Sequence, residues 1–483
     1  MAGTTGYTAQ PSPRTSGHPF RLNPPAPAPD RAPRAPQTHA PIPLWRQLQA
    51  AAAVLQSIRE GASATPALAA VEASLRPGVQ SLVFHALRHL GRAEVLRSLL
   101  ANRNPPPRAD ALLCLALALA WREADAPYDA FTLVNQAVEA ANRGPAKAQA
   151  SFLNACLRRF LREREELVAI SERDPVAVWN HPRWWIQRLR KEQPERWQAV
   201  LAANNRHAPM TLRVNPRRTT MAGFTQALAA AGIGSTPAGP SGVTLDAPHP
   251  VQAIPGFDTG AFSVQDAAAQ LAAPLLLSEL DTRQPQSELD SAQPLRLLDA
   301  CAAPGGKTAH LLELADAQVT ALDIDAQRCQ RIHDTLARLG LTAEVVAADA
   351  GNPGAWWNGL AFDGILLDAP CTASGIVRRH PDVRWLRRES DIAQLAAIQA
   401  KLLERLWPLL KPGGRMVYCT CSVFRAEGQE QIETFLTRHT DALLKPSPGH
   451  LMPQSRPDGD AFPDNPSSDN DGFFYALLEK IAV

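Results

Sequence analysis

Several common signatures are absent from this sequence of 483 residues. None of the cysteines stands in a Cys-x-x-Cys pair, which argues against a zinc ribbon, and we expect no metal site. The Gly-x-Gly-x-x-Gly fingerprint of dinucleotide-binding loops is missing as well. No apolar run is long enough to span a bilayer, and no charged segment followed by an apolar core begins the chain. We therefore expect a cytoplasmic protein with no membrane partner.

A strong charge of either sign is also lacking. The formal net charge is +2, which is too mild to indicate a nucleic-acid partner, so basic residues are informative only where they cluster. The seven cysteines are an odd number, and in a reducing compartment this favours free thiols, most of them inert. The length favours about three domains.

The N-terminal part divides into two segments. Residues 1–43 are rich in Pro, Ala, Thr and Arg, which predicts a disordered tail. Its arginines could contact RNA, although a solvated extension is the favoured interpretation. Residues 44–165 have apolar positions at three- and four-residue spacing, broken by Gly61, Pro77-Gly78 and residues 105–107, which predicts an all-α bundle.

Residues 166–265 form a linker helix and a small α+β module. The Trp-rich, basic stretch at 181–191 suits RNA contact, but we favour an amphipathic helix with Trp185 and Leu189 as core anchors. Strands are predicted at 210–216 and 242–245, with a helix at 219–231 between them.

From residue 266 to 483 strand and helix patterns alternate. A helix at 267–277 and a polar surface loop at 281–293 come first. Strands are then predicted at 295–299, 318–323, 343–349, 362–368, 415–420 and 472–478, and helices up to 315 and at 326–339 and 392–410. Repeated βα units predict a parallel, doubly wound α/β sheet that binds ligands beyond the C-terminal ends of its strands.

The loop after the first of these strands is a candidate cofactor loop. A strand, a glycine turn and a helix start bring backbone N–H groups close to a ligand. Gly306-Lys307-Thr308 matches the end of a P-loop, but the first glycine of that motif would fall at Cys301, so the loop is not a P-loop.

Acidic residues stand at four successive strand ends: Asp299, Asp323, Asp349 and Asp368. Their repetition at one sheet edge argues against four unrelated helix caps. A carboxylate at the end of the second strand suits the hydroxyls of a ribose, which favours Asp323, with Asp325 as the alternative.

Two cysteines are predicted to reach the same edge. Cys371 follows one strand in Asp368-Ala369-Pro370-Cys371, and Cys421 follows another in Thr420-Cys421-Ser422. Two thiols beside a cofactor loop favour catalysis over buried apolar packing. A basic and aromatic cluster after Cys371 favours phosphate binding over a solvated loop; it comprises Arg378, Arg379, His380, Arg384, Trp385, Arg387 and Arg388.

These motifs together resemble the Sun/Nop2/NSUN family of RNA 5-methylcytosine methyltransferases. Residues 131–160 resemble a NusB-type RNA-binding domain, with a plain bundle for protein contacts as the alternative. The motif at 255–266 and the sequence Asp471-Gly472-Phe473-Phe474-Tyr475-Ala476 resemble the bacterial RsmB branch, which acts on small-subunit ribosomal RNA. The resemblance implies a Rossmann-like methyltransferase domain at 266–483, preceded by a NusB-like domain at 44–165 and the α+β RNA-binding module.

The resemblance implies S-adenosylmethionine as cofactor and assigns roles to residues. Cys421 would be the attacking thiolate, Cys371 would assist breakdown of the adduct, and Asp368 would hold the base, with Lys307 beside it. Cys419 shares the strand parity of Cys421 and is the alternative nucleophile. The implied cofactor residues are Cys301, Ala302, Ala303, Pro304, Gly305, Gly306, Lys307, Asp323, Asp349 and Asp368.

The implied substrate is an unpaired cytidine of 16S ribosomal RNA, methylated at carbon 5 by a monomeric enzyme. The alternatives are another RNA, either tRNA or large-subunit rRNA, and a non-catalytic ribosome assembly factor. An amino-group methyltransferase would carry Asn-Pro-Pro-Tyr where this chain has Asp-Ala-Pro-Cys. One departure is Gly428, where many relatives have asparagine, and it puts the local geometry in question.

Overall fold

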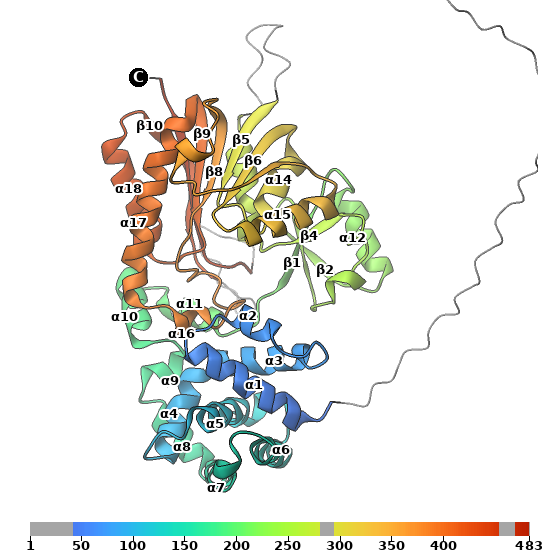
Figure 1. The fold of residues 1–483 in the computed structure, drawn as a ribbon, viewed down its shortest axis with the longest axis vertical. Helices are drawn as coiled ribbons and strands as arrows, with labels where there is room; N and C mark the ends of the chain where they lie inside the picture. The colour runs from blue at the N-terminus through green and yellow to red at the C-terminus, as the bar shows by residue number, and fades with distance from the viewer. Residues whose placement is uncertain (1–41, 281–293, 454–468, 483) are drawn as a thin grey trace, which may run out of the picture. The chain divides into compact units, whose positions relative to one another are not determined.

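The computed structural model describes residues 42–280, 294–453 and 469–482. The predicted tail, apart from its last residues, and the predicted loop at 281–293 lie outside these ranges. The described chain begins with a helical bundle, as the apolar periodicity predicts (Figure 1). Its helices are α1 (Leu44–Arg59), α2 (Ala64–Ala69), α3 (Arg76–Arg88), α4 (Leu90–Leu100), α5 (Pro107–Ala120), α6 (Ala130–Asn142), α7 (Ala150–Arg162) and α8 (Arg164–Ser171).

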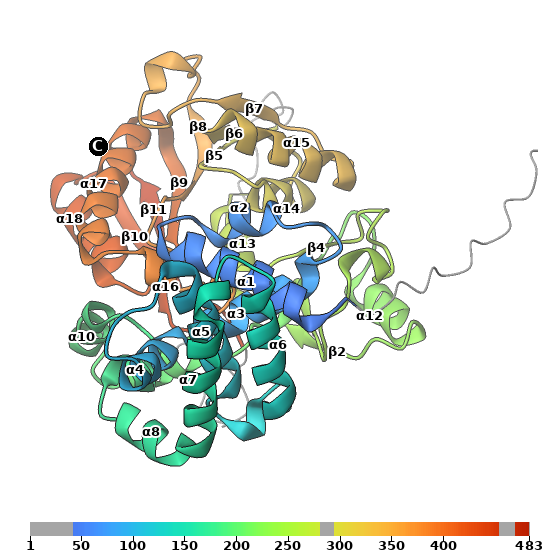
Figure 2. The same cartoon turned by 60° about the horizontal axis from the view of Figure 1, so that its bottom comes forward.

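Helix α5 is the centre of this bundle. Every residue of α5 from Ala109 to Ala120 is buried, and α1, α3, α4, α6 and α7 all pack against it (Figure 2). A helix that is apolar all round can be stable only when neighbours cover it on every side. On α7 the exposed Arg159 and Arg162 pair with Glu163.

Three short helices lead out of the bundle: α9 (Pro175–Trp179), α10 (Arg183–Glu192) and α11 (Trp197–Asn204). Trp185 and Leu189 of α10 are fully buried, which confirms them as core anchors. The Trp185 ring lies 5.3 Å from the ring of Phe424, measured between centroids, so α10 packs against the segment that follows Cys421.

The small α+β module is an antiparallel four-stranded sheet in the order β2-β3-β1-β4 with one helix, α12 (Met221–Ala230). Strands β1 (Met210–Val214) and β3 (Gly242–Leu245) match the predicted ones. The sequence did not predict β2 (Ser235–Ala238) or β4 (Phe262–Val264). Pro237 interrupts the strand pattern of β2 and is tolerated because β2 is an edge strand, while β4 has only three residues.

The C-terminal sheet has seven strands in the order β10-β11-β9-β8-β5-β6-β7. Strands β5 (Leu295–Ala300), β6 (Ala317–Asp323), β7 (Glu344–Ala347), β8 (Phe362–Asp368) and β9 (Leu410–Thr420) are parallel. The prediction of a wholly parallel sheet is wrong at one end. Strands β10 (Ala442–Leu451) and β11 (Phe473–Lys480) pair as an antiparallel hairpin, and β11 inserts antiparallel beside β9.

Helices cover both faces of this sheet (Figure 1). One apolar cluster includes α13 (Ala272–Leu277), α14 (Gly306–Leu314) and α15 (Ala326–Leu339), and the other includes α17 (Glu389–Leu406) and α18 (Gln429–Arg438). The helix predicted at 267–277 is a 3-10 turn, Ala268–Leu271, followed by α13. Within the described ranges, no helix has the length and apolar character of a membrane span.

Candidate active site

The candidate cofactor loop joins β5 to α14 with several fixed contacts. Cys301 has a φ of 144° and Gly305 a φ of 95°, so the chain turns sharply between strand and helix. Thr308 donates a hydrogen bond to the Asp299 carboxylate at 2.6 Å, directly beneath the loop. Burial raises the pKa of Asp299 to about 7. This hydrogen bond therefore joins the helix that follows the loop to the strand that precedes it.

The structure separates the two acidic candidates at the end of β6. Asp325 caps α15, because its carboxylate accepts the backbone N–H groups of Gln327 and Arg328. Asp323 accepts the N–H of Ala303 at 3.2 Å, which ties the end of β6 to the cofactor loop. Of these two carboxylates, that of Asp323 lines the adjoining cavity.

A cavity of about 300 Å³ opens at the carboxyl ends of the parallel strands. Its carboxylates come from three strand ends, as the sequence predicts: Asp323, Asp349 and Asp368. Its apolar wall includes Ile324, Ile398 and Leu402. Cys371 and Cys421 also line the cavity. Of the ten predicted cofactor residues, Cys301, Ala303, Asp323, Asp349 and Asp368 line the cavity, and Ala302, Pro304, Gly305, Gly306 and Lys307 do not.

The two predicted catalytic cysteines meet in this cavity. Their Sγ atoms lie 3.4 Å apart, although fifty residues separate them in the chain, and both are free thiols. The hydrogen bond to Cys421, together with burial, raises the pKa of Cys371 well above its ordinary value. Cys371 is therefore protonated at neutral pH and can donate its proton toward Cys421.

Cys419 is not among the residues that line the cavity. It is fully buried, and its thiol contacts the Asp368 carboxylate at 3.5 Å. Burial and the adjacent Asp368 raise its pKa well above the ordinary value. Cys419 and Cys421 do contact the same apolar cluster, as their strand parity predicts, but only Cys421 lines the cavity.

Lys307 and Asp368 form an ion pair across the sheet edge, with 2.6 Å between Nζ and Oδ2. Burial lowers the pKa of Lys307, but the Asp368 charge more than offsets this and holds it above its usual range. This pair links α14, which follows the cofactor loop, to the strand that leads to Cys371. A charged donor and a carboxylate are thereby held at the same edge of the sheet as the two thiols.

Glu427 is a buried carboxylate whose position the sequence did not reveal. Its oxygens accept hydrogen bonds from the N–H and hydroxyl of Thr372, the hydroxyl of Ser422 and the amide of Gln399. Thr372 and Ser422 are the residues that directly follow the two cysteines. Glu427 therefore fixes the spacing of the two thiols. Its place six residues after Cys421, in a buried segment, is the one sequence signal that could have found it.

We expect Glu427→Ala to lower kcat about 10–100-fold with little change in KM. The substitution removes four hydrogen bonds made by buried donors and loosens the two cysteine loops, and a displacement of about 1 Å at a reacting atom costs this much. Steady-state kinetics on protein shown by circular dichroism to be folded measures the effect. Glu430→Ala, an exposed glutamate on α18, is the control. An unchanged kcat would contradict the positioning role.

Gly428 departs from the asparagine of many relatives because the site is already filled. A Cβ atom at Gly428 would lie 2.7 Å from both Cε1 of His450 and Cγ of Phe474. An asparagine would therefore displace these two rings. Next to Gly428, the hydrogen bonds of Glu427 with Thr372 and Ser422 are intact, so the departure leaves the cysteine frame unchanged.

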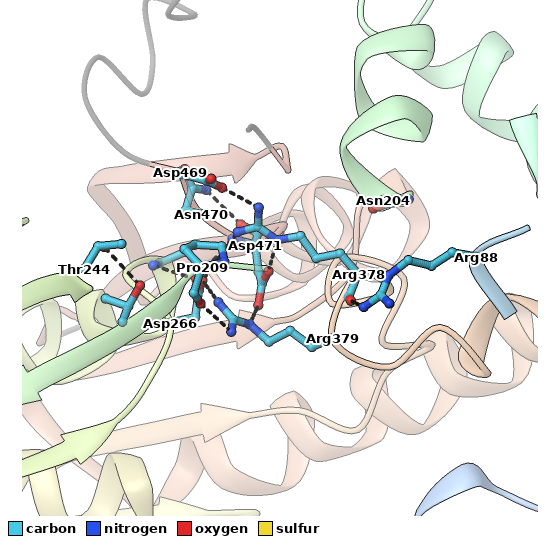
Figure 3. A network of polar contacts seen from close by, with 12 residues as sticks. Arg88, Asn204, Pro209, Thr244, Asp266, Arg378, Arg379, Asp469, Asn470 and Asp471 are labelled. Atoms are coloured by element: carbon cyan, nitrogen blue, oxygen red, sulfur yellow. Dashed lines mark hydrogen bonds and ion pairs between the residues drawn. The ribbon is translucent and has the colours of Figure 1, made fainter. Parts of the chain in front are cut away.

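The structure corrects the phosphate-binding prediction for the basic cluster after Cys371. Arg378 and Arg384 are fully buried. Arg378 and Arg379 pair with Asp266 and Asp471, which come from the two outlying sequence motifs (Figure 3). These two arginines join the motifs to the Cys371 segment and, contrary to the prediction, do not present an open phosphate-binding surface.

The other members of the cluster divide between structural and exposed positions. Arg384 donates to the backbone carbonyls of Asn180 and Asn204. Arg387 donates to the carbonyl of Thr372 at 3.0 Å. His380 and Arg388 are exposed. The prediction is therefore wrong for Arg378, Arg379 and Arg384, whose partners lie far away in the sequence.

Three segments of the chain match the models of known protein families. Residues 287–479 match the model of the 16S rRNA methyltransferase RsmB/F family, residues 181–252 match its ferredoxin-like domain, and residues 46–162 match the NusB family. The chain is 39% identical over 439 residues to the ribosomal RNA small subunit methyltransferase B of Vibrio cholerae, covering 89% of this chain and 96% of the relative. The corresponding protein of Vibrio vulnificus is 39% identical over 447 residues, covering 90% and 99%.

Solved structures agree with this. The crystal structure of PH0851 superposes with a TM-score of 0.69 at 25% identity, over 90% of this chain and 99% of that one. A methyltransferase homolog from Pyrococcus horikoshii superposes with a TM-score of 0.51 at 26% identity, over 63% and 97%. Because near-full-length relatives share 39% of their residues with it, this chain belongs to the RsmB/F family of 16S rRNA methyltransferases.

Proposed function

We propose that this methyltransferase transfers a methyl group to carbon 5 of a cytidine in 16S ribosomal RNA through a covalent adduct with Cys421. The observation that carries the proposal is the pair of thiols 3.4 Å apart in a cavity with a carboxylate-bearing wall. Carbon 5 of cytosine is a poor nucleophile until a thiolate adds to carbon 6. A second thiol within reach of the first is suited to assist the later cleavage of the bond between sulfur and carbon 6.

The cavity fits the cofactor of this methyltransferase, S-adenosylmethionine. This cofactor supplies the methyl group as part of a sulfonium when it is bound. Asp323 and Asp349 offer carboxylates for ribose hydroxyls and for the adenine edge, and Ile324, Ile398 and Leu402 offer apolar surface for the adenine ring. Asp368 lies in the same wall as the cysteines, at the junction where cofactor and base would meet.

The protein's own residues would act in a fixed order. The Cys421 thiolate would form a bond to carbon 6, and the electron pair displaced onto carbon 5 would form the new bond to the methyl group as the bond between that methyl and the sulfonium sulfur breaks and leaves its electrons on the sulfur. Asp368, held by Lys307, accepts a hydrogen bond from the base and orients it. Water would then accept the proton from carbon 5, the electrons of that carbon–hydrogen bond would restore the double bond between carbons 5 and 6, and the sulfur–carbon bond would break with its electrons returning to Cys421. We assign Cys371 to assist this breakdown.

Ribosomal RNA of the small subunit is the proposed substrate because the relatives of nearly equal length are small subunit methyltransferases. NusB-like and ferredoxin-like modules precede the catalytic domain and would bind the RNA. The cytosine must be unpaired or extruded, since carbon 6 is inaccessible within a stacked helix.

Bisulfite sequencing of ribosomal RNA tests the proposal. In cells that lack the protein, one 5-methylcytosine of 16S rRNA should disappear, and the wild-type gene should restore it. A gene carrying Cys421→Ala should not restore it. If all 5-methylcytosines of 16S rRNA persist, the proposed substrate is wrong, and loss of one from tRNA or large-subunit rRNA would reassign it.

A further inference from the structure

A second cavity, of about 500 Å³, lies between the helical bundle and the segment that follows Cys371. Helix α3 contributes Arg76, Gln80 and Arg88 to its wall, and the segment after Cys371 contributes Arg378, Arg379 and His380. The remaining basic residue is His207, in the stretch before β1. Among the described residues that line this cavity there is no carboxylate, so its wall is basic.

Arg88 is the distinctive residue of this cavity. Its side chain is buried, with 5% of the residue exposed, and it donates one hydrogen bond, from Nη2 to the Arg378 carbonyl at 2.9 Å (Figure 3). No carboxylate pairs with it in the described part of the chain. Burial lowers the pKa of Arg88 to about 10, so it remains charged at neutral pH. A buried charge without a counter-charge is costly, and because Arg88 also lines the cavity, an anion bound there would offset this cost.

The carboxylates that contact Arg378 and Arg379 are already neutralised. Asp266, Asp469 and Asp471 pair with Arg378 and Arg379, and none of the three lines the cavity. Arg76 donates to the backbone carbonyls of Ala69 and Val71 and has no described carboxylate partner. The cavity therefore presents uncompensated positive charge to whatever enters it.

We propose that this cavity binds a phosphodiester of the RNA substrate, with Arg88 as its central ligand. The proposal rests on the proposed function, because it takes ribosomal RNA as the occupant. A guanidinium binds phosphate oxygens through two parallel hydrogen bonds, and phosphate contacts fix the register of a nucleic acid on its protein. His380 follows Cys371 by nine residues, so a phosphate bound here would anchor the RNA strand beside the catalytic segment.

RNA binding across a salt series tests this site. The probe is a 16S rRNA fragment that contains the methylated cytidine, and its affinity is measured by fluorescence anisotropy. Arg88→Met should weaken binding about tenfold and lower the slope of log K against log salt by about 0.7–1, as expected for one lost phosphate contact. Arg331→Met, an exposed arginine on α15, should change neither quantity.

Substitutions at Gln80 avoid the risk that Arg88→Met disturbs folding. Gln80 is exposed on α3 and lines the cavity, and both glutamate and lysine are good helix formers. Gln80→Glu should weaken binding severalfold and Gln80→Lys should strengthen it severalfold. An affinity and salt slope that stay unchanged through both Gln80 variants would overturn the site.

Methyl transfer to the same RNA is measured as well, so that failure of the phosphate site can be distinguished from failure of the proposed function. If the wild-type protein methylates the RNA but the Gln80 series leaves affinity unchanged, the phosphate site is wrong and the function stands. If the series changes affinity but the RNA is not methylated, the phosphate site stands and the proposed function is wrong.

Discussion

Cys421→Ala is expected to abolish both covalent capture of RNA and methyl transfer, with a loss of activity of at least about a thousandfold. Removing a nucleophile leaves only the binding and orienting groups of the site. Cys371→Ala should instead allow the first bond to form and accumulate a covalent complex, because the thiol that assists breakdown is missing. The opposite behaviour of two sulfurs only 3.4 Å apart makes this pair of variants the sharpest test of their roles.

Denaturing gel electrophoresis of the protein incubated with RNA and S-adenosylmethionine measures the covalent complex. Cys419→Ala is the matched control. This cysteine lies on β9, two residues before Cys421, but is fully buried beside Asp368. It should retain adduct formation. A covalent complex that persists in Cys421→Ala and disappears in Cys419→Ala would reverse the assignment of the nucleophile.

Arg213→Met is expected to reduce the free energy of unfolding by about 3–5 kcal/mol. Arg213 of β1 binds the Glu313 carboxylate of α14 through two hydrogen bonds of 2.9 Å, and both side chains are buried. Removing the guanidinium leaves the Glu313 charge without its partner inside the protein. Arg213 also donates to the carbonyl of Gly306, so the start of the cofactor helix should loosen too.

The loss should depend on pH in a defined direction. Burial, only partly offset by Arg213, raises the pKa of Glu313 above its ordinary value of 4.5. Without Arg213 this pKa rises further, so Glu313 takes up a proton as the pH falls and the penalty shrinks. Guanidinium denaturation followed by tryptophan fluorescence should therefore show a larger loss at pH 8 than at pH 5.

The control for this experiment is Arg162→Met, which removes an exposed ion pair with Glu163. It should change stability by less than about 1 kcal/mol at either pH. Adding Glu313→Gln to Arg213→Met should recover stability at pH 8, since the buried charge is then gone. An equal loss at both pH values would contradict the account based on an unpaired Glu313.

Local pattern predicted those elements whose ends carry strong signals. Helix α15 has the predicted bounds because Asp325 caps its start and Gly340, with a φ of 66°, ends it. Strand β8 carries the apolar run 364–367 and ends at Asp368. Strand β10 was not predicted, because its prolines and Gly449 resemble a loop, and its pairing with β11 is irregular at that point.

The sequence predicted those residues of the site that stand at the ends of strands. Cys371, Cys421 and the acidic strand ends meet because parallel strands present their carboxyl ends at one edge. The ion pairs of Arg378 and Arg379 were not predictable, since Arg379 and its partner Asp266 are 113 positions apart in the chain. A local cluster of arginines has the same appearance whether its counter-charges lie in the RNA or elsewhere in the protein.

The insertion of β11 beside β9 has a consequence for biosynthesis. Strand β9 leads directly to Cys421, and its neighbours in the sheet are β8 on one side and β11 on the other. A nascent chain can fold its N-terminal helices while translation continues. It cannot give β9 its second neighbour until the ribosome has made the residues through Lys480. The strand that leads to Cys421 is thus among the last parts of the molecule to be completed, after the helical bundle has been made.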